Sequence, residues 1–120
     1  MDLNNLEISR QCLKIQEMIF FITQRFPKYG PVGLTEKLRK TSLKIINNIE
    51  EGLGVSQSIE SMHQLNKALS ELETLAAAIR FAKEKGYMGL LGYELIALNI
   101  NECKSSVMSH LVHIKRKQIA

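Results

Sequence analysis

The sequence has no tryptophan, only two cysteines, only two prolines and no long hydrophobic run. Two isolated cysteines, Cys12 and Cys103, do not make a disulfide framework and favour a reducing setting. The N-terminus carries no charged and then apolar leader, so we expect a cytoplasmic protein. The longest lipid-like segment, residues 18–22, is far too short to span a bilayer.

Proline and glycine are too scarce for a disordered or low-complexity chain, with two and seven residues among 120. The chain is 45% hydrophobic and 23% charged, which is enough apolar material for a buried core. Its length is that of one domain, so a single domain is predicted over residues 1–120.

Apolar residues recur at steps of three and four in four segments, which is the spacing of one face of an α-helix. The first segment runs from Ile8 and is predicted to end at Pro27. The second starts near Leu34 and is predicted to end at Gly52 and Gly54, where a left-handed glycine usually closes a helix.

The third segment is predicted from about Ser58 to Lys85, with Gly86 as its stop. The fourth is predicted to follow the glycines of residues 89–92, with an apolar stripe from Ile96 to Ile114. No segment alternates with period two, so no strands are expected. Four helices with short connectors predict an all-α fold, an antiparallel up-down four-helix bundle.

The fourth segment has apolar residues on two sides. Leu91, Leu95 and Leu98 lie nearly opposite the stripe that contains Ile96 and Ile100. Because a helix that is apolar on two sides is covered twice, we predict a homo-oligomer with Leu91, Leu95 and Leu98 in its interface.

Metal chemistry has one weak candidate, in which Cys103, His110 and His113 share roughly one side of a helix. A zinc site would want a fourth ligand and second-shell acceptors that the sequence does not supply. We therefore interpret Cys103 as a packing residue and the histidines as surface residues, and expect no metal or cofactor.

Catalytic patterns are equally weak. The carboxylates worth weighing are Glu50, Glu51, Glu71 and Glu73, but neither pair points in one direction from a helix. Ser109 and His110 are sequence neighbours without a nucleophile's geometry, and the glycine pairs lack the spacing of a phosphate loop. No enzyme is predicted.

Charge is distributed unevenly along the chain. Sixteen basic and twelve acidic residues give a formal net charge of +4. Residues 25–44 hold six basic side chains against Glu36 alone, and residues 104–117 hold four more without an acid. The stretch between them, residues 45–73, sums to −4. The molecule is therefore expected to be electrically polarised.

The basic residues are the candidate contacts for nucleic acid: Arg25, Lys28, Lys37, Arg39, Lys40, Lys44, Lys115, Arg116 and Lys117. Such side chains on a rigid helix neutralise phosphates without reading sequence, and several copies in an oligomer act together. The alternative is a solvated face that only keeps the chain soluble. Few aromatic residues interleave with these cations, which argues against a stacking platform for single strands.

Several motifs, in their order, resemble a known family. Phe26-Pro27-Lys28, then residues 33–40 (GLTEKLRK) and 45–52 (IINNIEEG), are similar to the signature of the four-helix-bundle family encoded in intervening sequences of bacterial 23S rRNA genes. Residues 68–74, followed by Gly86-Tyr87, are similar to that family's third helix. Residues 79–83 also resemble a relative, the accessory variability protein of diversity-generating retroelements.

The resemblance implies a five-fold ring of bundles, no catalysis, and a role in contacting nucleic acid or a nucleic-acid enzyme such as a reverse transcriptase. It carries over Asn48, Glu51 and Gly52 as motif residues, for which helix-end hydrogen bonding and packing are the expected roles. Two functions stay open. One is a pentameric scaffold that binds RNA or DNA backbone, and the other is an oligomer of the same family that binds only proteins.

Overall fold

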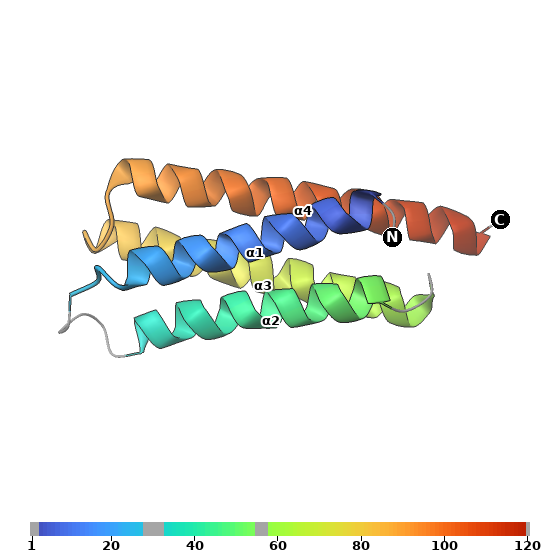
Figure 1. Cartoon of the computed structure of the whole chain (residues 1–120), viewed down its shortest axis with the longest axis horizontal. Coiled ribbons are helices and arrows are strands. Elements are labelled where there is room, and N and C mark those ends of the chain that lie inside the picture. Colours follow the sequence, from blue (N-terminus) through green and yellow to red (C-terminus); the bar gives the residue numbers. More distant parts are fainter. Residues whose placement is uncertain (1–2, 28–32, 55–57, 120) are drawn as a thin grey trace.

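Four α-helices make up the part of the chain that the computed structural model describes, residues 3–27, 33–54 and 58–119, and no strand occurs there. The helices are α1 (Leu3–Thr23), α2 (Leu34–Gly54), α3 (Ile59–Glu84) and α4 (Leu90–Ile119). Consecutive helices run in opposite directions and form a rod of 53 × 23 × 21 Å (Figure 1). α1 and α3 each contact both α2 and α4, so α2 and α4 lie diagonally across the bundle. The predicted all-α four-helix fold is confirmed.

The core is formed by the stripes that the spacing predicted. Ile15, Ile45, Leu72 and Ile100, one from each helix, are at most 1% exposed. α3 buries more than its predicted stripe, because Ala68, Leu75 and Ala78 are also buried. Short alanine side chains leave room for the neighbouring helix, so this wider face of α3 packs closely against α2.

The predicted end of the first helix at Pro27 was wrong, since α1 ends at Thr23. The amides of Arg25 and Phe26 donate to the carbonyls of Ile22 and Thr23, at 3.1 and 3.2 Å, in turns of four residues. A proline disfavours the helical conformation of the residue before it, and here the chain already leaves the α-helix in the preceding turn. The helix therefore ends four residues before Pro27.

The expected left-handed glycine at the end of the second helix was also wrong. Among the described glycines, only Gly33 and Gly86 have positive φ, 85° and 78°. Gly52 lies inside α2 and is buried, and a Cβ there would meet Leu65 Cγ at 2.7 Å. The hydroxyl of Ser61 donates to the carbonyl of Gly52 and fastens the start of α3 to the end of α2. Gly52 is thus required for close helix packing.

The ends of α3 agree closely with the prediction. Ser58 is the N-cap, and its hydroxyl accepts from the amide of Ser61 at 3.3 Å. At the other end, the amides of Gly86 and Tyr87 donate to Lys83 and Ala82, which is the hydrogen-bond pattern of a Schellman motif. Gly86 stops the helix as predicted, because the motif needs positive φ at that position.

The fourth helix begins earlier than predicted, because α4 starts at Leu90 and includes Gly92. The amide of Tyr93 donates to the carbonyl of Gly89 at 3.0 Å, so Gly89 marks the helix start. Within the described ranges, no helix has the length and apolar character needed to cross a membrane.

Candidate functional site

The candidate basic residues fall into two groups at opposite ends of the bundle. α1 ends, α2 begins, α3 ends and α4 begins at one end of the rod (Figure 1). We call this the basic end, and define it by seven side chains: Arg25, Lys37, Arg39, Lys40, Arg80, Lys83 and Lys85. Among the described residues, the same turns hold three acids, Glu36, Glu84 and Glu94. Lys44 follows one turn further along α2, and Lys28 lies outside the described residues.

The second basic group is separate from the first. Lys115, Arg116 and Lys117 are exposed in the last turns of α4, which projects past the other helices (Figure 1). That end of the bundle also holds Glu50 and Glu51 near the end of α2, and Glu60 in the first turn of α3. The two groups therefore do not form one surface, and the second stands beside a comparable number of acids.

Most cations of the basic end have no carboxylate partner. Among the described residues of this group, only Lys40 has a carboxylate within 4.0 Å, a 2.9 Å contact with Glu36 one turn earlier. The hydrogen bond from Lys40, and then its charge, lowers the pKa of Glu36. Both side chains are about two-thirds exposed, so this pair contributes little to stability.

Arg39 differs from the exposed lysines because it is half-buried between α1 and α2. Its Nε donates to the hydroxyl of Thr23 at 2.9 Å, and its guanidinium lies 4.9 Å from the ring centroid of Phe20. The Thr23 hydroxyl in turn donates to the carbonyl of Ile19 at 2.7 Å. Arg39 thus holds the start of α2 against the end of α1.

Aromatic rings at the basic end are the feature that sequence reasoning missed. Four cations lie over ring faces, with centroid distances between 4.6 and 5.5 Å. The pairs are Arg25 over Phe21, Arg39 over Phe20, Lys83 over Tyr93 and Lys85 over Phe81. The rings come from α1, α3 and α4, so the structure places aromatics beside cations from outside the sequence stretch 25–44, whose own aromatics are Phe26 and Tyr29.

An apolar patch lies beside the basic end on the seam of α1 and α4. It consists of Phe21, Leu91, Leu95 and Leu98, each at least 48% exposed. A groove of about 400 Å³ lies along this seam. Phe21, Met18 and Ile22 of α1 line it together with Leu95 of α4. The three predicted interface leucines are therefore on the surface of the single chain, and Phe21 extends their patch onto a second helix.

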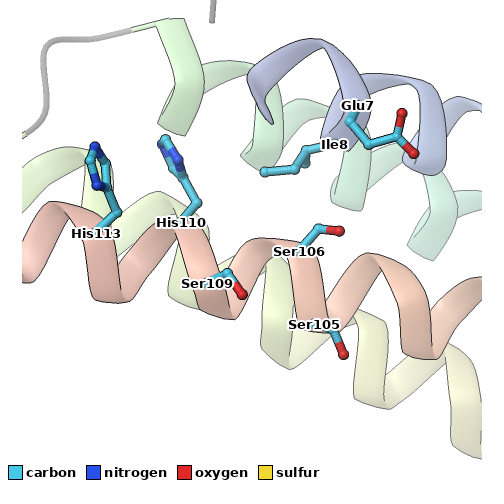
Figure 2. A pocket seen from close by; sticks show the side chains of 7 residues that line it. All are labelled: Glu7, Ile8, Ser105, Ser106, Ser109, His110 and His113. Atoms are coloured by element: carbon cyan, nitrogen blue, oxygen red, sulfur yellow. The ribbon is translucent and has the colours of Figure 1, made fainter. Parts of the chain in front are cut away.

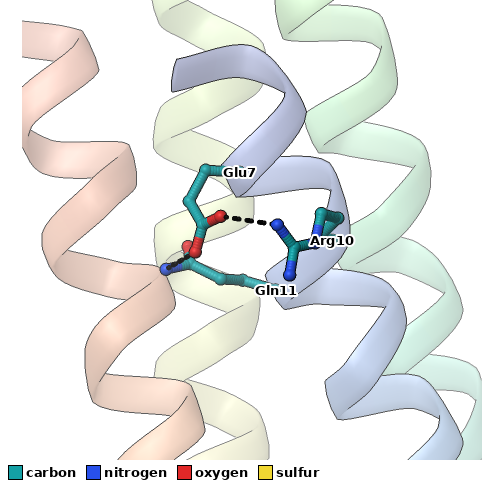
Figure 3. A network of polar contacts seen from close by, with 3 residues as sticks. All are labelled: Glu7, Arg10 and Gln11. Atoms are coloured by element: carbon teal, nitrogen blue, oxygen red, sulfur yellow. Dashed lines mark hydrogen bonds and ion pairs between the residues drawn. The ribbon is translucent and has the colours of Figure 1, made fainter. Parts of the chain in front are cut away.

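The same seam becomes polar toward the other end of the bundle. Glu7 accepts from Arg10 at 3.4 Å and from Gln11 at 3.5 Å, in a network along one side of α1 (Figure 3). Asn99 and Glu102 of α4 line the adjoining groove. The apolar patch is therefore bounded, and covers only the half of the seam nearest the basic end.

A second polar groove of about 350 Å³ separates α1 from the later part of α4 (Figure 2). His110, Ser106 and His113 line it, opposite Glu7 and Ile8. The expectation that both histidines are surface residues was wrong for His110, which is 5% exposed, and His113 is exposed as expected. The periodicity of α4 explains this, since His110 falls between Val107 and Ile114 on the buried stripe.

The weak metal candidate is not assembled. Cys103 and His110 are seven residues apart, which on a helix separates them by about 10 Å along the axis although they share a side. Within the described ranges, no three His, Cys, Asp or Glu side chains are placed to hold a metal ion.

The candidate carboxylates are also dispersed. Glu50, Glu51 and Glu73 are exposed, and Glu71 is half-buried. Glu73 forms an ion pair with Lys104 at 3.6 Å that links α3 to α4. Of the family-motif residues, Asn48 is half-buried on α2 and Glu51 is exposed, while Gly52 packs as described above.

The two cysteines are free and buried in the core. Burial, and then the charge of Glu50, raises the pKa of Cys12 from 9.0 to about 11. Burial, and then Cys12 itself, raises the pKa of Cys103 from 9.0 to about 12. The ionised thiolates are therefore disfavoured in the folded chain.

A pH dependence of stability follows from the two thiols. Because they ionise more readily in the unfolded chain, their contribution is fully present below pH 9.0 and is lost as pH rises toward 11 and 12. We expect urea midpoints to fall between about pH 8 and about pH 10.5. Replacing both cysteines by alanine should make that fall smaller, and an equal fall in both proteins would contradict this account.

The fold defines a class, the small antiparallel four-helix bundle, here with a basic end and an apolar patch on its surface. Within that class the chain belongs to the 23S rRNA-intervening sequence protein family, whose model matches residues 4–109. The structure is similar to a protein of unknown function from the S23 ribosomal protein family of Bacteroides thetaiotaomicron, with a TM-score of 0.81. Sequence identity to it is 14%, over 91% of this chain and 98% of that one. None of the functionally curated proteins matches this sequence.

Proposed function

We propose that this chain is a non-catalytic, self-associating module that binds the phosphate backbone of nucleic acid through its basic end. The observation that carries the proposal is the excess of cations there, of which only Lys40 has a carboxylate within 4.0 Å among the described residues. Lys37 and Lys44 are exposed on rigid helix, so a phosphate contact orders the lysine side chain but not the backbone.

Binding that neutralises phosphates can be recognised by the dependence of its affinity on salt concentration. Each lysine or arginine that contacts a phosphate releases condensed counterions, so affinity falls steeply with salt and depends little on base sequence. One basic end is a modest patch, and several copies on one assembly raise the overall affinity for a long polymer.

The apolar patch supports the self-association part of the proposal. Phe21, Leu91, Leu95 and Leu98 are exposed apolar side chains on two helices that meet at one groove, and a second copy of the chain offers the same side chains as a partner. The resemblance noted in the sequence sets the expected assembly at five copies in a ring. The basic ends of such copies would be held together on one particle.

The test uses two variants that change net charge equally. Lys37, Lys40 and Lys44 are replaced by glutamate in the first, and Lys115, Arg116 and Lys117 in the control. All six side chains are exposed, so both variants should fold, which circular dichroism verifies. At low salt we expect the first variant to bind labelled RNA and DNA about 100-fold more weakly than the natural chain, and the control to bind almost normally.

Equal losses in the two variants would mean that net charge alone drives binding, and would refute the basic end as the site. No binding by the natural chain at low salt would refute nucleic-acid binding itself and favour the protein-binding oligomer. A partnership with a reverse transcriptase is a narrower form of the proposal, and co-purification of the two proteins tests it.

A further inference from the structure

A groove between α2 and α3 opens at the basic end. Its volume is about 540 Å³, and Leu34 and Lys37 of α2 face Ala77, Ala78 and Phe81 of α3 across it. This volume lies in the range of sites that hold small organic molecules. Phe81 supplies the aromatic ring among the residues that line the groove.

Phe81 combines exposure with a groove that holds a cation, Lys37, whereas the charged residue that lines the groove beside Phe21 is Glu17. Phe81 is 40% exposed, and the Nζ of Lys85 lies 5.5 Å from its ring centroid. Lys37 contributes a second ammonium group to the opposite wall. Neither lysine has a carboxylate within 4.0 Å among the described residues.

We infer that this groove takes one unpaired base of a single-stranded nucleic acid, stacked on Phe81, with the flanking phosphates at Lys37 and Lys85. The inference rests on the proposed function and adds to it the kind of nucleic acid. Every base has a π-face, so stacking on phenylalanine accepts any sequence. The Lys85 ammonium, which lies over the ring in the free chain, would move from the ring to a backbone phosphate when the base stacks.

A duplex does not satisfy this site as well as a single strand. Paired bases are stacked on their neighbours and cannot reach a ring that lies between two helices without being extruded, which costs a few kcal/mol. A duplex would contact the lysines alone. An apolar side chain from a second copy is also a poorer occupant, because it would desolvate Lys37 and Lys85 without neutralising them.

The first experiment uses the natural chain and three fluorescein-labelled probes of equal length. These are an oligothymidylate strand, the same strand with abasic sugars throughout, and a duplex. Anisotropy titrations at one low salt concentration give the affinities. We expect the base-bearing strand to bind about tenfold or more tightly than the abasic strand, which keeps every phosphate.

The second experiment changes the ring. Phe81→Ala should lower affinity for the base-bearing strand about tenfold and leave affinity for the abasic strand unchanged. Phe81→Tyr should restore the loss, because a tyrosine ring stacks equally well. Leu43→Ala is the control, since Leu43 is 43% exposed on α2 and does not line the groove.

The outcomes separate this inference from the proposed function. Equal binding of all three probes by the natural chain, or no effect of Phe81→Ala, would overturn the base site while leaving phosphate binding intact. Absence of binding to every probe would remove both. A change of assembly size in Phe81→Ala, measured by light scattering, would show that another copy occupies the groove and would also overturn the inference.

Discussion

Replacing Leu95 and Leu98 by aspartate is expected to convert the proposed assembly into single chains of 13.6 kDa. Both leucines are about half exposed in the apolar patch, so their side chains contribute little to the stability of the single folded chain. In an assembly that covers the patch, each aspartate would be buried without a partner, a cost of several kcal/mol per charge. Size-exclusion chromatography with light scattering measures the mass directly.

The matched control for this prediction lies on the same helix. Met108 and Val112 are also about half exposed on α4 but lie outside the patch, and replacing them by aspartate should leave the assembly intact. A natural chain that is already monomeric at high concentration, or a control that dissociates equally, would contradict self-association through the patch.

Replacing Gly52 by valine is expected to lower the free energy of unfolding by about 3 kcal/mol. A Cβ at this position would lie 2.7 Å from Leu65 Cγ and 3.3 Å from the carbonyl oxygen of Ser61. Leu65 is fully buried and Ser61 O is backbone, so relief requires that α2 and α3 move apart. The midpoint of thermal unfolding should fall by about 10 °C, measured by circular dichroism.

Gly54 provides the comparison for Gly52, because it ends the same helix and a Cβ there meets nothing within 4 Å. Gly54→Val should change the free energy of unfolding by less than about 0.5 kcal/mol. If the two valine variants were equally stable, the close approach of α2 and α3 at Gly52 would not matter energetically.

The helices were predictable because the apolar residues that a helix buries recur every three to four positions in the sequence. The third segment was placed to within a residue, since Ser58 caps it and Gly86 stops it, and both signals are local. The end of α1 and the start of α4 were displaced because turns near Pro27 and Gly89 depend on hydrogen bonds that composition does not specify. The same spacing of buried apolar residues explains how a protein with only 14% sequence identity to this chain has the same fold.

The surfaces were predictable only in part. The three interface leucines followed from one helix, but Phe21 completes their patch from another helix that the sequence does not place beside them. Likewise, Phe21 with Arg25 and Phe81 with Lys85 are four residues apart, a spacing that could have been recognised. The contacts of Arg39 with Phe20 and of Lys83 with Tyr93 join different helices and required the structure.

The most direct test of the account compares how affinity for single-stranded nucleic acid depends on salt in two proteins. For the natural chain we expect log affinity to fall linearly with log salt. For the variant with Lys37, Lys40 and Lys44 replaced by glutamine, the slope should be shallower by about 2, since each lost phosphate contact removes about 0.7. An identical slope in the two proteins would show that these lysines do not touch the phosphates.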